Sequence, residues 1–155
     1  MPTRRRAPKF RMLPPHLVLL LLLSVLVLWR LFPGPDTLSG AWRLLGLPIG
    51  LLGIVVNLGA WRQFRAARTN IKTFNAPGRL VTEGWFRRSR NPMYLGFTLL
   101  LVAAATVTGS AFAFVGPLLF VLVSQFVYIP FEEEAMSEAF GEAYAHYRQK
   151  VRRWL

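Results

Sequence analysis

The sequence predicts an all-α, polytopic membrane protein with four transmembrane helices and a C-terminal amphipathic helix on the cytoplasmic side. The 155 residues are 54% hydrophobic and only 17% charged, a composition typical of membrane proteins. Four apolar runs are separated by basic blocks and short turns, and a segment with helical periodicity follows the last run. A single domain over residues 1–155 accounts for this length.

The first span is expected over residues 14–32. Residues 1–11 carry five basic side chains and no acid, and the apolar residues that follow are mostly Leu and Val. This arrangement resembles a signal peptide, but no small-residue cleavage site follows it. We therefore expect a retained span, long enough for the ~20 residues that a bilayer requires. The Pro- and Gly-rich residues 33–40 then form a short turn.

The second span is expected over residues 44–61. Trp42 and Trp61 bracket it, as aromatic residues do at membrane interfaces. Three glycines in its first half allow close approach of another helix: Gly46, Gly50 and Gly53. Its one strongly polar residue, Asn57, is expected to hydrogen-bond a neighbouring helix.

A basic loop over residues 62–91 separates the second span from the third. It contains eight Lys or Arg residues and a single acid, Glu83. The third and fourth spans are expected over residues 93–107 and 111–129, joined by a tight turn.

The basic residues are distributed as topology determinants. Five precede the first span, eight lie in the loop and four follow the fourth span, whereas the two short turns hold essentially none. The positive-inside rule then places both termini and the loop in the cytoplasm of a multi-pass protein of the cell (inner) membrane. The net charge of +12 therefore indicates contact with membrane lipids, and we expect no nucleic-acid partner.

The composition also limits the chemistry. The chain has no Cys, and its two histidines, His16 and His146, lie at opposite ends. A thiol nucleophile is excluded, and we expect no metal site.

The C-terminal amphipathic helix is expected over residues 131–151. Its apolar residues recur at three- and four-residue steps, and we expect it to lie on the cytoplasmic membrane surface or on the basic loop. Its other face carries five acids: Glu132, Glu133, Glu134, Glu138 and Glu142. The last three are expected to be solvated. Glu132 and Glu133 lie where the fourth span leaves the membrane, within reach of Asn91 and Pro92.

Residues 84–96 combine arginines, an Asn-Pro step and Tyr94 at the start of the third span. One interpretation is an interfacial anchor, which composition alone favours. The other is a ligand pocket at a helix N-terminus, where free amides lie beside cationic and aromatic side chains.

A resemblance favours the pocket. Gly78-Arg-Leu-Val-Thr-Glu-Gly84, Arg90-Asn-Pro-Met-Tyr-Leu-Gly96, Glu132-Glu133 and Phe140-Gly141 followed by Tyr144 resemble the isoprenylcysteine carboxyl methyltransferase and phospholipid methyltransferase family. These ordered blocks cover roughly the C-terminal half of the chain and are more specific than a lone motif. The resemblance implies an integral-membrane methyltransferase that uses S-adenosyl-L-methionine and a lipid-like or small amphiphilic acceptor.

The resemblance also implies the site residues. The cofactor-binding residues would be Gly78, Arg79, Leu80, Val81, Phe86, Asn91, Pro92, Met93, Tyr94 and Glu132, and the catalytic candidates Arg90, Glu132 and Glu133.

The sequence departs from the family pattern at three positions. Asn91 stands where many members have His, and it cannot act as a base. Phe86 stands where Tyr is usual. Tyr128 stands where prenylcysteine-modifying members carry an Arg thought to engage the substrate carboxylate, so an acceptor with a free carboxylate is disfavoured here.

Two other functions fit parts of the sequence. A membrane reductase with a nicotinamide cofactor would share a related C-terminal architecture, but its extended motifs are absent. A non-enzymatic scaffold could bind anionic lipids through the basic loop, but it gives no reason for the paired glutamates.

Overall fold

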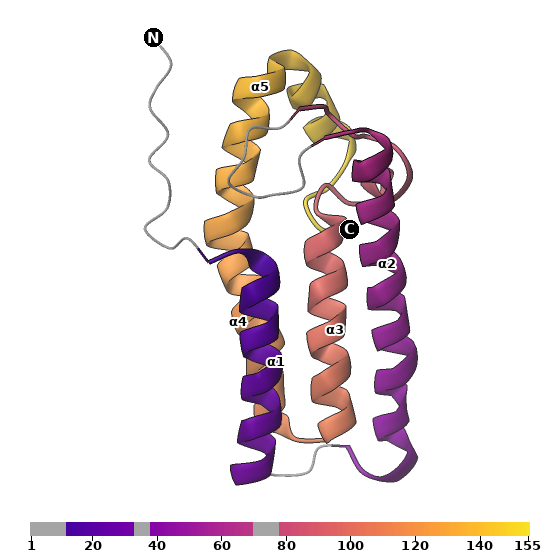
Figure 1. Ribbon diagram of the computed structural model, residues 1–155, viewed down its shortest axis with the longest axis vertical. Helices are drawn as coiled ribbons and strands as arrows, with labels where there is room; N and C mark the ends of the chain where they lie inside the picture. The colour runs from indigo at the N-terminus through magenta and orange to yellow at the C-terminus, as the bar shows by residue number, and fades with distance from the viewer. Residues whose placement is uncertain (1–11, 33–37, 70–77) are drawn as a thin grey trace.

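The structure, a computed structural model, describes residues 12–32, 38–69 and 78–155. These residues form helices joined by turns, with no extended strand among them (Figure 1). The basic residues expected before the first span (Arg4, Arg5, Arg6, Lys9 and Arg11), much of the first turn and residues 70–77 of the basic loop lie outside the described residues.

The part of the chain that the structure describes contains five α-helices. They are α1 (Pro14–Leu31), α2 (Gly46–Ala66), α3 (Pro92–Thr108), α4 (Val115–Val123) and α5 (Ile129–Lys150). Short 3-10 helices precede α2 and α4 at Gly40–Leu45 and Ala111–Phe114, and a third lies at Gly84–Arg87. A π-helical segment, Ser124–Tyr128, joins α4 to α5, so that a helical rod begins at Ala111 and continues into α5.

Among the described residues, three helical stretches are long and apolar enough to cross a membrane: Pro14–Leu31, Gly40–Ala66 and Ala111–Lys150. The apolar helix α3 is shorter, with 17 residues. Large apolar side chains on α1 and α2 are exposed, among them Leu23, Leu51 and Leu58. In a membrane protein such side chains face lipid, and the apolar core between the helices is correspondingly small.

Helices α2 and α3 pack closely through glycines. A Cβ atom added to Gly53 would lie 2.9 Å from the carbonyl oxygen of Gly96, closer than carbon and oxygen atoms pack. Asn57 lies at the same crossing, but its Nδ2 donates to the Gly53 carbonyl of its own helix at 3.1 Å. The expected hydrogen bond from Asn57 to a neighbouring helix is therefore wrong, since the close glycine contact leaves the amide facing its own backbone.

One helix boundary and the shape of one helix differ from those expected. Helix α2 continues to Ala66, five residues beyond the expected end at residue 61, so Arg62 and Arg65 lie on a helix and not in the loop. Helix α5 is not the one straight helix expected over residues 131–151. It extends the rod of α4 and breaks at Gly141, where φ is 49° and ψ is −121°.

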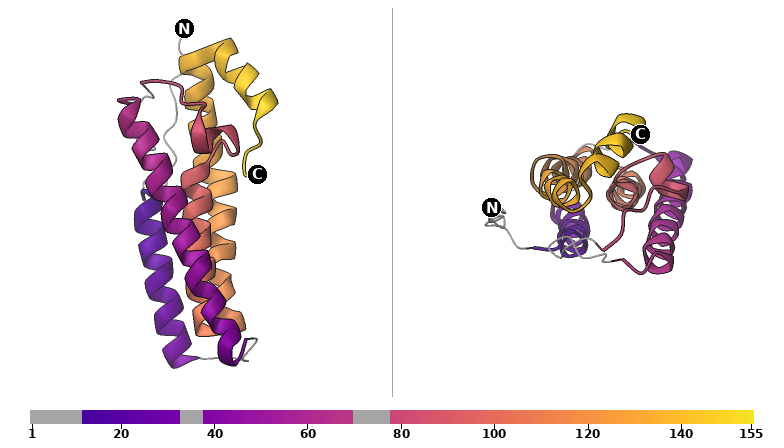
Figure 2. Two further views of the ribbon diagram at one scale, coloured as in Figure 1. Left: turned by 90° about the vertical axis from the view of Figure 1, so that its right-hand side faces the viewer. Right: turned by 90° about the horizontal axis from the view of Figure 1, so that it is seen from above.

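The break at Gly141 returns the chain to the bundle. Beyond it, the last turns of α5 run back toward the start of α3, and the C-terminus lies beside α3 (Figures 1 and 2). Glu134, Glu138 and Glu142 are exposed, whereas Ala135, Tyr144 and Tyr147 are buried. The apolar face of α5 therefore faces the protein.

Candidate functional site

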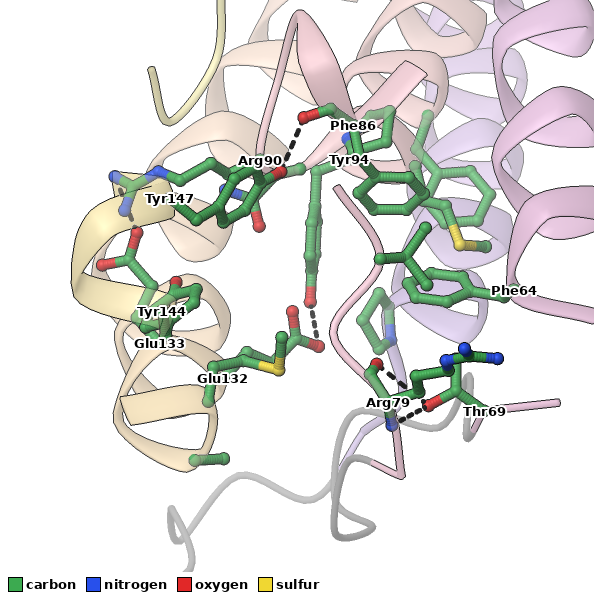
Figure 3. A pocket seen from close by; sticks show the side chains of 18 of the residues that line it. Phe64, Thr69, Arg79, Phe86, Arg90, Tyr94, Glu132, Glu133, Tyr144 and Tyr147 are labelled. Carbon is green, nitrogen blue, oxygen red and sulfur yellow. Dashed lines mark hydrogen bonds and ion pairs between the residues drawn. The ribbon is translucent and has the colours of Figure 1, made fainter. Parts of the chain in front are cut away.

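A cavity lies at the end of the bundle where α3 begins and α5 leaves the membrane-spanning rod (Figure 3). It has a volume of about 180 Å³, less than the ~300–1,000 Å³ typical of small-molecule pockets. A nucleoside-sized ligand would therefore extend beyond the enclosed volume. The lining residues come from all parts of the fold: Pro14 and Pro15 of α1, Phe64 of α2, Thr69, Arg79, Val81 and Phe86 of the loop, Arg90 to Tyr94 and Phe97 around α3, and Glu132, Glu133, Ala135, Met136, Tyr144 and Tyr147 of α5.

The loop wall is anchored on the last turns of α2. The Gln63 side chain donates from Nε2 to the Glu83 carbonyl at 3.2 Å and accepts from the Trp85 N–H at 3.2 Å. Phe86, which is 5% exposed, packs edge to face on Phe64 with ring centroids 4.8 Å apart. The unexpected extension of α2 to Ala66 thus supplies both the anchor and one aromatic wall.

The rim of the cavity is held by Thr69. Its hydroxyl oxygen accepts from the backbone N–H groups of Gly78 at 3.1 Å and Arg79 at 2.9 Å, and the hydroxyl group is within 3.3 Å of the Arg79 carbonyl. The segment that carries Arg79 is therefore tied to the end of α2.

Tyr94 stands at the centre of the cavity and orients Glu132. Its hydroxyl donates to Glu132 Oε1 at 2.9 Å, and its ring stacks on Tyr128 with centroids 6.1 Å apart and planes at 25°. Figure 3 shows Phe64 and Phe86 on one side of the Tyr94 ring and Glu133 and Tyr144 on the other. A carboxylate held by a hydroxyl and faced by aromatic rings is suited to a cationic or hydroxyl-bearing ligand.

Glu133, next in sequence, has different partners. Its Oε1 lies 3.0 Å from Arg90 Nη2, and Arg153 approaches both oxygens, from Nη2 to Oε2 at 2.6 Å and from Nε to Oε1 at 3.2 Å. The residue as a whole is 8% exposed. The Glu133 carboxylate is thus already bound by two guanidinium groups of the protein.

Two tyrosines of α5 form the remaining wall. The Tyr147 hydroxyl donates to the Phe86 carbonyl at 2.7 Å. Burial raises the pKa of the Tyr144 hydroxyl, and the Glu133 charge raises it further, against the opposing effect of Arg90 and Arg148. Burial likewise raises the pKa of Tyr147. Both hydroxyls therefore stay protonated at neutral pH and act as hydrogen-bond groups, not as bases.

The structure brings the two expected segments together. Of the residues suggested by the resemblance, ten line the cavity, whereas Gly78 and Leu80 are not among its lining residues. The ten are Arg79, Val81, Phe86, Arg90, Asn91, Pro92, Met93, Tyr94, Glu132 and Glu133. Sequence reasoning missed Phe64, Thr69 and Phe97, which carry no local signal. Tyr144 and Tyr147 belong to the resemblance and to the apolar period of the last helix, but neither was proposed as a site residue, although their hydroxyls within an apolar face were a usable signal.

The three departures from the family pattern have structural partners. Asn91 Nδ2 donates to the Arg153 carbonyl at 3.0 Å, so this side chain is used for packing. Phe86 presents its ring to Phe64. The Tyr128 hydroxyl donates to the Met12 carbonyl at 2.8 Å, behind Tyr94 and away from the cavity lining. No cation replaces the missing Arg at this position.

The arrangement provides positioning groups and no strong base. No histidine lines the cavity, and no cluster of three potential metal ligands occurs within residues 12–32, 38–69 and 78–155. Carboxylate, guanidinium, aromatic and backbone groups converge instead. Such a site can hold a polar cofactor beside an apolar acceptor and exclude water from the space between them.

Comparison with known proteins gives two matches. A family model described as phospholipid methyltransferase matches residues 42–143, which include most of the cavity-lining segments. An uncharacterized protein of Haemophilus influenzae is 41% identical over 63 residues, which cover 41% of this chain and the whole of that relative.

Proposed function

The chain belongs to the phospholipid methyltransferase family, and we propose that it transfers a methyl group from S-adenosyl-L-methionine to a lipid-like or small amphiphilic acceptor at the cytoplasmic membrane face. The observation that carries this proposal is the convergence of Tyr94 and Glu132 with Phe64 and Phe86 in one cavity. The family match favours methyl transfer over a nicotinamide-dependent reduction.

The proposed membrane arrangement has four spans with both termini in the cytoplasm. In it, α1, α2, α3 and the rod from Ala111 cross the membrane of the cell, and the cavity end of the bundle faces the cytoplasm. The described basic residues support this orientation, because Arg62, Arg65, Arg87 and Arg88 are exposed at the cavity end.

The cavity residues fit the cofactor class. Glu132, held by Tyr94, would bind the amino group or hydroxyls of the cofactor, and Phe64 and Phe86 would cover its planar or sulfonium part. The N–H groups in the first turn of α3 precede the first intrahelical bond, Leu95 N–H to Asn91 O, and they would bind a carboxylate.

Bound S-adenosyl-L-methionine supplies a methyl group activated by the sulfonium, and transfer is a displacement at that methyl. The residues of this chain would align the acceptor with the methyl group and exclude water from the space between them. Pro14, Pro15 and Phe97 form the apolar wall nearest the spans, and they would seat the apolar part of the acceptor. An amine acceptor would need only desolvation to attack.

The acceptor is proposed to lack a free carboxylate at its reacting end. Tyr128 turns its hydroxyl to Met12, and the ring packs behind Tyr94. A carboxylate there would have no guanidinium partner from this position. The isoprenylcysteine type of acceptor is therefore disfavoured, and an amine or another neutral amphiphile is preferred.

Calorimetry with the purified protein in detergent tests the proposal. We expect saturable binding of S-adenosylhomocysteine and none of reduced nicotinamide. Glu132→Ala and Tyr94→Ala should weaken this binding at least tenfold, whereas Glu134→Ala, which removes an exposed acid two residues away, should leave it unchanged. Incubation with isotopically labelled cofactor and membrane lipids, followed by mass spectrometry, would identify the acceptor. If neither ligand binds, the methyltransferase proposal is wrong.

A further inference from the structure

The C-terminal tail, residues 151–155, is bound to the start of α3 by an arrangement that the proposed reaction does not explain. Three consecutive residues before α3 take part in it. The Arg90 N–H donates to the Arg152 carbonyl at 3.0 Å, and the Arg153 carbonyl accepts from Asn91 Nδ2 at 3.0 Å and from the Ser89 hydroxyl at 3.3 Å. Ser89 is 1% exposed, so the tail covers this corner.

The Glu133 carboxylate links the tail to the residue that precedes Asn91 and α3. It lies between Arg90, which precedes α3, and Arg153, which belongs to the tail, and it contacts both guanidinium groups at 3.0 Å and 2.6 Å. The side chains of Glu133 and Arg90 are each 10% exposed. Without the carboxylate, two cations would remain close together, with Arg90 largely buried and Arg153 28% exposed, and their repulsion would no longer be offset.

The tail has a second attachment on the opposite side. Trp154 Nε1 donates to Gln125 Oε1 at 2.9 Å, and Gln125 belongs to the π-helical segment that joins α4 to α5. The tail thus connects the end of the membrane-spanning rod to the start of α3. Both Arg90 and Asn91 line the cavity, so their positions depend on whether the tail is in place.

We propose that Glu133 is a positioning residue: it seats the C-terminal tail against residues 89–91 and thereby fixes the Arg90–Asn91 wall of the cavity. The two glutamates then have different roles: Glu132 faces the cavity with Tyr94, while Glu133 is held by Arg90 and Arg153. The predicted effect on cofactor affinity rests on the proposed function, but the seating of the tail does not.

Hydrogen exchange at the Arg90 amide, measured by mass spectrometry with residue resolution on the full-length protein in nanodiscs, tests the seating directly. That N–H is bonded to the tail. Glu133→Gln, which keeps the volume and removes the charge, should speed exchange at Arg90 by about 10–100-fold, the range expected for loss of a charge-assisted contact. Glu132→Gln and the exposed control Glu134→Gln should leave that exchange unchanged.

Calorimetry with S-adenosylhomocysteine on the same variants separates the two proposals. Glu133→Gln should weaken binding about tenfold, together with faster Arg90 exchange, and Glu132→Gln should weaken binding with exchange unaltered. If Glu133→Gln weakens binding while Arg90 exchange stays as in the wild type, Glu133 touches the ligand and the positioning role is overturned. If the wild type binds no S-adenosylhomocysteine, the proposed function fails, and Arg90 exchange still decides the seating.

Arg153 gives an independent test if Glu133→Gln does not fold. Arg153→Lys keeps a cation but loses the two-pronged contact with Glu133, whereas Arg153→Ala loses both. We expect Arg90 exchange to rise in the order wild type, Arg153→Lys, Arg153→Ala. Equal exchange in all three proteins would overturn the proposal.

Discussion

The two ends of the helix bundle are closed by different kinds of interaction. At the end away from the cavity, backbone groups and short turns predominate: the Leu38 N–H donates to the Gly109 carbonyl at 3.3 Å, and Arg43 Nε donates to the Leu38 carbonyl at 2.9 Å. At the cavity end, side chains bond across long separations in sequence, such as Tyr94 with Glu132 and Tyr147 with Phe86. Every acidic residue that the structure describes lies at the cavity end (Figure 1).

This difference between the two ends predicts which of them affects ligand binding. The bonds that close the far end are accepted by backbone carbonyls in short turns, so this end depends mainly on keeping the turn geometry. The cavity end depends on which polar side chains are present, because each buried donor or acceptor there needs a particular partner. Matched substitutions at the two ends should therefore differ in their effect on ligand binding more than in their effect on stability.

Two glycines with positive φ give the largest expected effects. Gly109, with φ 71°, ends α3, and an added Cβ would lie 2.5 Å from the Leu38 carbonyl oxygen. Gly109→Ala should lower the free energy of unfolding by ~3 kcal/mol, from backbone strain and overpacking together. Gly141, with φ 49°, has open space around its Cβ position, so Gly141→Ala meets conformational strain alone, ~1–3 kcal/mol.

The effects on ligand affinity should follow the opposite order, with the larger effect for Gly141→Ala. Gly141→Ala straightens the break that returns α5 to the bundle, so we expect weaker S-adenosylhomocysteine binding by calorimetry. Gly109→Ala should bind with wild-type affinity wherever it remains folded, as judged by thermal unfolding in detergent. A Gly109→Ala protein that is folded but has lost affinity would contradict the separation between the two ends.

Removing one hydroxyl group at each end of the bundle should have a smaller effect, and these two substitutions are more closely matched. The Thr108 hydroxyl donates to the Ala105 carbonyl at 2.7 Å at the far end, and the Tyr147 hydroxyl donates to the Phe86 carbonyl at 2.7 Å at the cavity. Thr108→Val and Tyr147→Phe should each lower stability by ~1 kcal/mol, the usual net value of a buried hydrogen bond. Only Tyr147→Phe should also weaken S-adenosylhomocysteine binding, because Phe86 forms a wall of the cavity. Equal affinities in the two variants would show that this bond serves packing alone.

The same contrast explains how much could be predicted from the sequence. The all-helical fold follows from local apolar runs, and the Pro92 start and the Gly109 turn follow from backbone preferences of single residues. The break at Gly141 was missed, because the apolar period of α5 continues across it and a helical pattern does not report φ.

The site was predictable only in part. The resemblance brought Asn91–Pro92 together with Glu132, and the structure places them in one cavity. It named only Glu132 as cofactor-binding but kept both glutamates as catalytic candidates. It did not predict the partners of Glu133, since these include Arg153, 20 residues further on, and depend on where the tail folds. Phe64 and Thr69 were missed for a similar reason: they gain a role only once α2 extends to Ala66 and meets the loop.

The smallest expected effect concerns the exposed basic residues around the cavity. Arg65 is exposed, and its guanidinium lies over the Trp61 ring at 4.9 Å from the centroid. Arg65→Ala should change stability by less than ~1 kcal/mol, because an exposed cation–π contact contributes little. It should nevertheless weaken association with vesicles that contain anionic lipid, since each basic residue near such a surface contributes ~1 kcal/mol, and added salt should reduce the difference.

Arg65→Lys is the matched control, with vesicle association close to that of the wild type. Because Arg65 lies outside the cavity lining, S-adenosylhomocysteine affinity should be unchanged, and a parallel loss of lipid association and ligand binding would show that lipid contact and the cavity are not independent.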